Sequence, residues 1–166
     1  THYFGQKFSE AYDIKFLNKN NELEYAYQTS WGVTTRMIGA LIMVHSDDDG
    51  LVLPPNIAPT QVAIIPIGND SKVDDLVNDT YNKLIDSDIS CYIDSTDKSP
   101  GFKFAEAEVN GIPVRVEIGA RDLEKGLITI ARRDTKEKYQ VSSDTNIVEY
   151  VKELMNKIQK DMYNKA

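Results

Sequence analysis

The sequence predicts an α/β fold in which helices flank a mixed sheet, preceded by a part that contains an antiparallel hairpin. Two observations predict the sheet: short apolar segments alternate with amphipathic helical segments after residue 60, and several of these apolar segments show strand-like alternation. A third observation separates the two parts. The stretch "LVLPPNIAP" at 51–59 is too rich in proline for a helix. We therefore expect a domain boundary within this stretch.

The first part opens with a hairpin pattern. Two β-rich segments, "YDIKFL" and "LEYAYQ", flank the turn-forming "NKNN". An apolar helix then follows Thr34 and Thr35, either of which can cap it, and we expect it to run to about His45. Its segment "MIGALIMV" has no polar face, which predicts burial. Arg36 lies at the start of this helix and needs an anion or a carboxylate partner there.

The second part contains the elements of the predicted sheet. Ser71 is the expected N-cap of an amphipathic helix that follows the strand "QVAIIPI". A short helix within "SPGFKFAEAEVNG" should stop at Asn110-Gly111. The last helix should run from about Asn146 to Asn164, with six apolar residues on one face: Ile147, Val151, Leu154, Met155, Ile158 and Met162. The other expected strands are "ISCYID", "PVRVEIG", "GLITIARRD" and "EKYQVSSD".

Composition excludes several classes of site. The chain has 166 residues, one cysteine and two histidines, so it has neither an intrachain disulfide nor a dedicated Cys/His zinc site. The three aspartates of "SDDDG" could suggest Mg²⁺, but a solvated helix end is the preferred interpretation, and we expect no bound metal. No apolar run is long enough to span a bilayer and no signal peptide is visible, which predicts a cytoplasmic protein that does not bind a membrane.

The charge distribution is uneven. The net charge of −7 argues against non-specific binding of nucleic acid. Basic residues nevertheless gather in one region, which suits selective contact with phosphate. We expect this region and Lys103 to lie on or beside one face of the second part. Composition alone favours the alternative, a sheet face with ordinary surface charges. The residues are Arg115, Arg121, Lys125, Arg132, Arg133, Lys136 and Lys138.

Six segments, spread along nearly the whole chain, carry a resemblance to a known family and follow that family's order. They are "HYFGQKF", "YQTSWGVTTRMIG", "MVHSDDDGLVLPPNIAPTQVAIIPI", "SPGFKF", "GIPVRVEIGARD" and "ARRDT". The stretch from Gln28 to Gln61 resembles motif 3 of class II aminoacyl-tRNA synthetases, and the series is similar to prolyl-tRNA synthetases of the archaeal and eukaryotic cytosolic type. The resemblance implies that residues 1–59 end a class II catalytic domain and residues 60–166 form its anticodon-binding domain.

The resemblance assigns ATP and proline contacts to the first domain. It implies that Arg36 contacts the phosphates of ATP and that Thr34 is a second ATP contact. A guanidinium suits this role because it offers a planar fork for phosphate and a flat face for adenine. The alternative is an ion pair between Arg36 and an aspartate at the helix end. The residues implied for the proline pocket are His2, Ser30, Trp31 and Gly32.

The resemblance also assigns contacts with the anticodon. The lysine of "SPGFKF" would lie near the bases, a glutamate would accept hydrogen bonds from a base edge, and two arginines would contact the backbone or stack. The residues are Lys103, Glu106, Arg132 and Arg133. For Lys103 the alternative is a surface lysine on a short helix. Two positions depart from the family: Thr96 stands where relatives often have arginine, and Ala107 where they often have tryptophan.

The resemblance implies a larger parent enzyme, because motifs 1 and 2 and a further C-terminal domain have no counterpart in the sequence. The parent would use ATP with Mg²⁺, L-proline and tRNA(Pro) and would be a homodimer. We expect no covalent nucleophile, no catalytic residue in this chain and no activity of the chain alone. The alternatives are a threonyl- or glycyl-tRNA synthetase fragment, and a non-catalytic RNA-binding or regulatory protein that uses the same domain.

Overall fold

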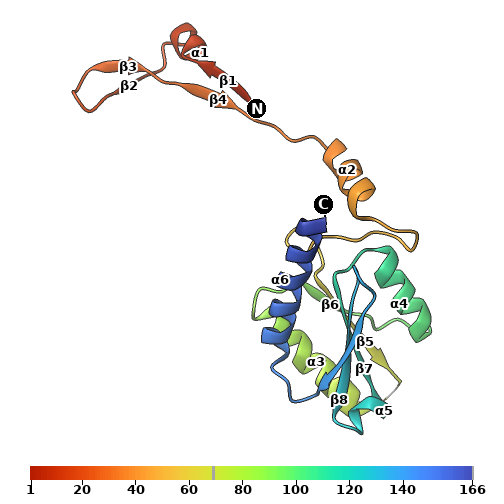
Figure 1. Ribbon diagram of the computed structural model, residues 1–166. Coiled ribbons are helices and arrows are strands. Elements are labelled where there is room, and N and C mark those ends of the chain that lie inside the picture. The colour runs from red at the N-terminus through yellow and green to blue at the C-terminus, as the bar shows by residue number, and fades with distance from the viewer. Residues whose placement is uncertain (69, 166) are drawn as a thin grey trace. The chain divides into compact units, whose positions relative to one another are not determined.

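The computed structural model describes residues 1–68 and 70–165. The chain forms two compact units, residues 1–39 and 40–166 (Figure 1). This division falls within a helix and not at the predicted boundary after Pro59. The predicted boundary concerns domains of the family, and it stays a prediction.

The first unit consists of two antiparallel strand pairs and one short helix. Strand β1 (His2–Gly5) pairs with β4 (Gln28–Ser30), and α1 (Lys7–Ala11) follows β1. Strands β2 (Lys15–Leu17) and β3 (Leu23–Tyr25) form the predicted hairpin, which is confirmed. Its turn is closed by the side chain of Asn18, whose Oδ1 accepts hydrogen bonds from the backbone N–H groups of Asn20 and Glu22.

Helix α2 (Arg36–His45) ends where the sequence predicts. Its first turn is closed by the carbonyls of Thr34 and Thr35, which accept from the N–H groups of Met37 and Ile38. The predicted burial is wrong, since none of its residues is buried and Met43 is 83% exposed. An apolar sequence is buried only where another layer covers it, and within the described chain no layer covers these side chains.

The second unit is built on a five-stranded mixed sheet, which confirms the predicted fold class. The strand order is β6-β5-β7-β8-β9, in which β6, β5 and β7 are parallel and the remaining pairings are antiparallel. The strand bounds are β5 (Val62–Ile67), β6 (Cys91–Ile93), β7 (Val114–Gly119), β8 (Leu127–Arg132) and β9 (Lys138–Ser142).

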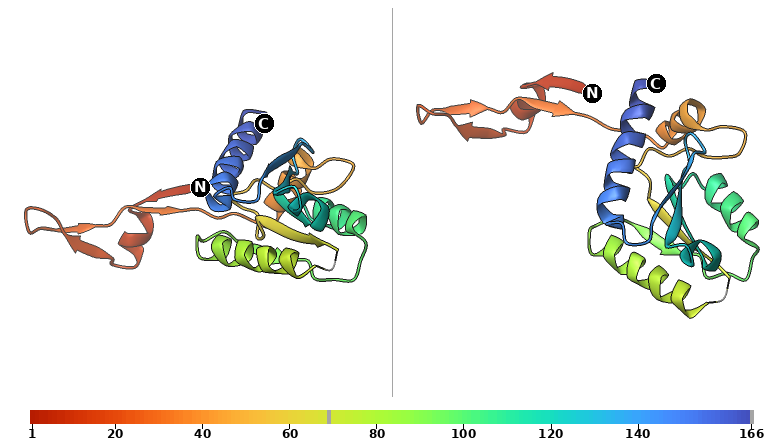
Figure 2. Two further views of the ribbon diagram at one scale, coloured as in Figure 1. Left: turned by 90° about the horizontal axis from the view of Figure 1, so that it is seen from below. Right: turned by 60° about the horizontal axis from the view of Figure 1, so that its bottom comes forward.

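Helices cover both faces of this sheet (Figure 2). On one face, α3 (Ser71–Ile85) and α6 (Ile147–Lys165) pack over the main core, which includes Val62 and Ile64 of β5. On the other face, α4 (Pro100–Val109) covers Ala63 of the same strand. The alternation along β5 therefore directs neighbouring side chains into two separate cores. A short helix, α5 (Ala120–Leu123), follows β7.

The helix predictions in this unit are largely confirmed. All six apolar residues that the sequence places on one face of the last helix are buried: Ile147, Val151, Leu154, Met155, Ile158 and Met162. Helix α4 ends at Asn110, as predicted. The predicted cap of α3 is wrong by one position. Asp70 is the N-cap, and its carboxylate accepts from the N–H of Lys72.

The segment that follows α2 packs against the end of α4. The N–H of Leu51 donates to the carbonyl of Val109 at 3.0 Å, and the N–H of Leu53 donates to that of Gly111 at 3.3 Å. Gly111 has φ +69°, and a Cβ at this position would lie 2.6 Å from the Cβ of Leu51. Only glycine permits so close an approach in this conformation. Residues 51–53 therefore belong physically to the second unit.

Candidate nucleic-acid interface

A groove lies at the carboxyl ends of β5 and β6. The chain passes from β5 through α3 to β6 and then through α4 to β7, on the other side of β5. Such a reversal of strand order leaves a crevice outside the carboxyl ends of the strands, where α/β proteins commonly bind ligands. The groove has a volume of about 700 Å³. Its lining residues include Pro66, Gly68, Asp74, Asn78, Ile93, Thr96, Asp97, Lys98 and Lys103.

Asp94 organises the loop that forms one wall of the groove. Its carboxylate Oδ1 accepts from the hydroxyl of Thr96 at 2.6 Å and from the backbone N–H of Thr96 at 3.1 Å. Its own N–H donates to the carbonyl of Ile64 at 2.9 Å, which ties the loop to β5. Thr96 therefore closes the loop through its hydroxyl and its backbone N–H.

Lys103 lies beneath this loop and lines the groove. The residue is only 6% exposed, so the alternative of an ordinary surface lysine is wrong. Its Nζ donates to the carbonyl of Asp94 at 2.8 Å and lies 3.8 Å from Asp94 Oδ1. An ammonium group carries three donors, and the bond to Asp94 O uses one of them. The loop thus holds a buried lysine in a fixed position at the wall of the groove.

Three further side chains gather where α4 begins. Lys98 Nζ lies 2.8 Å from Glu106 Oε2 and 3.1 Å from Oε1. The same ammonium lies 4.7 Å from the centre of the Phe102 ring, which is 55% exposed. The sequence analysis identified Glu106 but missed Lys98 and Phe102. The signal available was "KSPGF", in which Pro100 begins the helix and leaves the next two residues in its first, solvent-facing turn.

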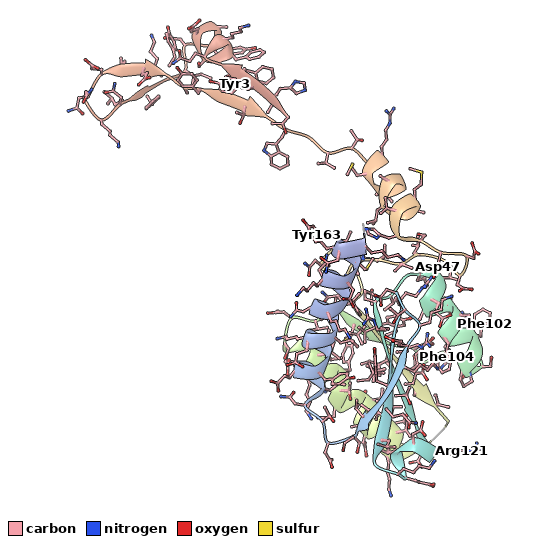
Figure 3. The ribbon with its side chains drawn as sticks, viewed as in Figure 1. Tyr3, Asp47, Phe102, Phe104, Arg121 and Tyr163 are labelled. Atoms are coloured by element: carbon pink, nitrogen blue, oxygen red, sulfur yellow. The ribbon has the colours of Figure 1, made fainter. Side chains whose placement is uncertain are left out.

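The other aromatic residue of α4 lies on the opposite side of the helix. Figure 3 shows Phe104 turned toward the sheet and Phe102 turned away from it. Arg115 lies over the Phe104 ring, 4.5 Å from its centre, and Lys138 lies 4.9 Å from it. Two carboxylates balance these two cations. Glu117 accepts from Arg115 Nε at 2.9 Å and pairs with Lys138 Nζ at 3.0 Å, and Glu108 Oε1 pairs with Arg115 Nη1 at 2.9 Å. This cluster stabilises the packing of α4 on the sheet.

Arg132 does not share a face with Arg115. It pairs in register with Val114, and the neighbouring Arg115 pairs with Ala131, so the two arginines point to opposite faces. The prediction of one basic face is therefore wrong for Arg132. Its guanidinium is bound by Asp134 at 2.6 and 2.8 Å and by Asp161 at 2.9 Å. The hydrogen bonds that Arg132 donates to Asp134, followed by the one that it donates to Asp161, raise the pKa of Arg132 above its usual value.

Arg133 joins three parts of the second unit. Its guanidinium forms two hydrogen bonds with the Asp47 carboxylate, at 2.5 and 2.8 Å, and donates to the carbonyl of Glu108 at 2.9 Å. These bonds hold the pKa of Asp47 well below its ordinary value. Lys136 pairs with Asp49 beside them. Contact of Arg132 or Arg133 with RNA stays a prediction, and such contact would have to compete with these carboxylates.

The first unit brings two of the predicted proline-pocket residues together. His2 pairs in register with Ser30 across β1 and β4. Trp31 follows β4 directly and is 77% exposed, and a Cβ added at Gly32 would meet nothing within 4 Å. The amino-acid contacts of these four residues stay predictions.

The two predicted ATP contacts lie at the start of α2. The carbonyl of Thr34 closes the first turn, and Arg36 is the first helical residue. Arg36 is exposed and forms no ion pair with any described residue, so the alternative of a pair with an aspartate at the helix end is wrong. Contact of Thr34 and Arg36 with ATP stays a prediction.

The described residues contain neither a cluster of metal ligands nor a membrane-spanning helix. Within residues 1–68 and 70–165, no three His, Cys, Asp or Glu side chains are grouped so that they could hold a metal ion. Over the same ranges, no helix combines the length and the apolar character needed to cross a membrane.

Residues 61–160, which contain the groove, match the sequence model of the family described as "Anticodon binding domain". The chain belongs to this family. It is also similar over its whole length to proteins named proline–tRNA ligase. The identity is 50% with that of Cytophaga hutchinsonii, 51% with that of Phocaeicola vulgatus and 49% with that of Mycoplasma mycoides. Each alignment covers 100% of this chain and 34 or 35% of the relative, so the chain spans about a third of the length of these relatives.

Proposed function

We propose that this chain is part of a proline–tRNA ligase, which activates L-proline with ATP and attaches it to tRNA(Pro). The observation that carries the proposal is identity of about 50% with three proteins of that name, continuous over both units. The names of these relatives favour proline over threonine or glycine, and an enzyme over a non-catalytic RNA-binding protein. We propose in addition that the parent is a cytoplasmic homodimer. Its motifs support the archaeal and eukaryotic subtype, although the relatives named above are bacterial.

In this proposal the first unit contributes to the activation of proline. Activation is attack of the proline carboxylate on the α-phosphate of ATP, so catalysis depends on positioning and on stabilisation of developing negative charge. Arg36 supplies a planar donor for phosphate, and Thr34 lies beside it. His2, Ser30, Trp31 and Gly32 form part of the wall around the proline ring. The Mg²⁺ that accompanies ATP has no ligand set among the described residues of this chain, so we assign it none here.

The second unit contributes recognition of the anticodon. Proline codons begin with two cytosines, so the anticodon of tRNA(Pro) presents two guanines. The pairing edge of guanine carries N–H donors beside a carbonyl acceptor, and loop bases expose that edge. A carboxylate and an ammonium are complementary to it. Glu106 and Lys103 provide these groups one helical turn apart on α4, and the fixed position of Lys103 beneath the Asp94 loop supports the assignment.

The experiment that tests this function is amino-acid-dependent exchange between ATP and pyrophosphate, measured on the full-length parent. Exchange should require L-proline, and Arg36→Ala should slow it by about 10²-fold or more, as loss of a donor to developing charge does. Affinity for tRNA should stay unchanged, because Arg36 is not part of the groove. The control is Lys19→Ala, at the exposed turn of the β2–β3 hairpin, which should exchange at the parental rate.

The alternatives give different results in the same assay. If exchange required threonine or glycine, that amino acid and not proline would be the substrate. Absence of exchange with every amino acid, together with binding of tRNA, would support a non-catalytic RNA-binding protein. A parental rate for Arg36→Ala would remove Arg36 from the ATP site.

A further inference from the structure

We propose that Phe102 is a stacking platform for an unpaired base of the bound RNA, at the rim of the groove. The inference rests on the proposed function, because it takes an RNA loop as the ligand of the second unit. It adds an aromatic contact and a displaceable lysine to the polar groups already assigned there.

Exposure alone does not single out Phe102, because isolated apolar side chains are common on protein surfaces. The contrast with Phe104 is more informative. Both rings lie on α4 and both contact cations, but Phe104 packs between the helix and the sheet under Arg115 and Lys138. Phe102 projects to solvent with 55% of its surface exposed, so it contributes little to the packing of α4. The ring is therefore available to a ligand.

The neighbour of Phe102 connects it to the groove. Lys98 lines the groove, and its ammonium lies 4.7 Å from the Phe102 ring centre. Lys103 and Pro100, on either side of Phe102 in the sequence, also line the groove. A base that enters along this wall would meet the Phe102 ring at the edge and Lys103 inside.

The Lys98 ammonium that lies over the Phe102 ring is weakly held. Lys98 and Glu106 are each 41% exposed, and an ion pair between exposed side chains is weak. The cation–π contact is also weak at an exposed site. Stacking of a base on an aromatic side chain is at least as strong as either contact. A base can therefore replace the ammonium on the ring. Displacement would free Lys98 for a phosphate and Glu106 for a base edge.

The charges around the ring favour a nucleobase as the occupant. Asp74 and Asp97 line the groove together with Lys98 and Lys103, so acidic and basic groups are interspersed. Such a mixture suits the donors and acceptors of a base edge better than a run of phosphates or an acidic peptide. A cation for the backbone is available at the same edge of the sheet. Arg121, in α5 directly after the carboxyl end of β7, is exposed and makes no ion pair with the described residues (Figure 3).

The test uses the full 166-residue chain and an RNA stem-loop with the anticodon arm sequence of tRNA(Pro). One anticodon-loop position carries 2-aminopurine, whose fluorescence reports stacking. Phe102→Ala should weaken binding by about 5- to 150-fold, the loss of one stacked base, and should remove the fluorescence change. Phe102→Trp should retain both. Phe102→Leu keeps an apolar side chain without the ring and should behave like Phe102→Ala.

Two further variants serve as controls. Val109→Ala removes another exposed apolar side chain, 56% exposed, from the far end of α4 and should bind like the parental chain. Lys98→Met should leave the fluorescence change in place. It should lower the slope of log affinity against log salt by about 0.7, the value for one phosphate contact to a single strand.

The outcomes separate this inference from the proposed function. Parental affinity and fluorescence for Phe102→Ala would refute the stacking platform. If Lys103→Ala still weakened the same stem-loop, the anticodon function would stand without it. Equal losses for Phe102→Ala and Val109→Ala would also refute the platform, because they would indicate a general effect on α4. If the parental chain did not bind the stem-loop at all, both the platform and the anticodon function would be overturned.

Discussion

Arg133 joins three parts of the second unit. Only 4% of it is exposed, and its guanidinium bonds Asp47 in the segment after α2 and the carbonyl of Glu108 in α4. A buried guanidinium without partners would be costly. The two carboxylate oxygens and the carbonyl satisfy it in a planar, forked arrangement. The pKa of Asp47 is lowered, chiefly by its hydrogen bonds with Arg133.

The lowered pKa of Asp47 makes this contact dependent on pH. A carboxyl group whose pKa falls below its ordinary value of 3.8 on folding binds protons more readily in the unfolded chain. The stabilisation is therefore complete above about pH 4 and is lost as the pH falls below that value toward the folded pKa. We expect Asp47→Asn to lower the free energy of unfolding by about 1–2 kcal/mol at pH 7, because a charge-assisted pair is lost but Asp47 is 35% exposed. Urea unfolding at pH 7, 5 and 3 measures the difference.

The matched control is Asp48→Asn. Asp48 is the exposed neighbour of Asp47 and forms no ion pair with the described residues, so this change should have an effect below about 0.5 kcal/mol at every pH. A difference between parental and Asp47→Asn chains that persisted undiminished at pH 3 would show that the loss does not come from ionisation of Asp47.

The sequence predicted some of the residues and contacts described above. It identified the cluster of basic residues near the end of the chain, and it identified Lys103 and Glu106 on a short helix. It did not pair Arg133 with Asp47, because these residues are 86 positions apart and no local pattern links them. It placed Arg132 with Arg115, although the strand register turns the two to opposite faces. Contacts that depend on strand register and distant loops cannot be derived from the periodicity of one segment.

At the scale of elements, periodicity predicted most of the second unit. Helix α6 buries all six residues expected from its 3.6-residue period, since the period itself defines the buried face. Helix α2 is the informative failure. Its composition predicts burial, but composition does not supply the layer that would cover it, and Ile38 and Met37 are each 59% exposed. Local patterns thus predict which elements form, and tertiary packing decides what covers them.

The contact between α4 and the segment after α2 depends on one glycine. In Gly111→Ala, the new Cβ would lie 2.6 Å from Leu51 Cβ and 2.8 Å from Leu51 O, at a position that already has φ +69°. The backbone term costs about 1–2 kcal/mol, and displacement of Leu51 adds about 1–3 kcal/mol. We expect Gly111→Ala to lower the free energy of unfolding by about 2–5 kcal/mol, measured by urea or thermal unfolding.

Gly126→Ala measures the cost of the positive φ alone, without a steric clash. Gly126 has φ +70°, almost the same as Gly111, but a Cβ there would meet nothing within 4 Å. This variant should lose only about 1–2 kcal/mol. Equal losses for the two variants would mean that Leu51 moves aside without cost, and that the close approach does not contribute to stability.

At the scale of the whole molecule, the buried core lies in the second unit. The main core cluster runs in sequence from Val52 to Met162. In the first unit Ser9 is buried, and its hydroxyl donates to the carbonyls of Gln6 and Ala26, but large side chains such as Tyr3 and Tyr12 are 70% and 72% exposed. A free energy of folding that derives from apolar burial must therefore come chiefly from residues after about position 50.

This distribution predicts how shortened chains behave. A chain that begins at Ala40 should unfold cooperatively with a free energy within about 1 kcal/mol of the full chain, because it keeps the whole main core. A chain that begins at Gln61 matches the family boundary but lacks Asp47, the main-chain bonds of residues 51 and 53, and the buried side chain of Val52. It should fold but lose about 2–5 kcal/mol, since one buried aliphatic side chain contributes about 1.5–3 kcal/mol and the hydrogen bonds contribute further.

Arg133 provides the check that this loss comes from the segment after α2. In the chain that begins at Ala40, Arg133→Met should lower stability, because it leaves Asp47 without its partner. In the chain that begins at Gln61, the same change should cost much less or stabilise, because Arg133 has already lost Asp47 and its charge is a burden at a site that is 4% exposed in the full chain. The two shortened chains, each with and without Arg133→Met, form a double-mutant cycle of free energies of unfolding, measured in urea. Equal effects of Arg133→Met in both backgrounds would show that residues 40–60 do not stabilise the second unit through this arginine, and that the family boundary is also the physical one.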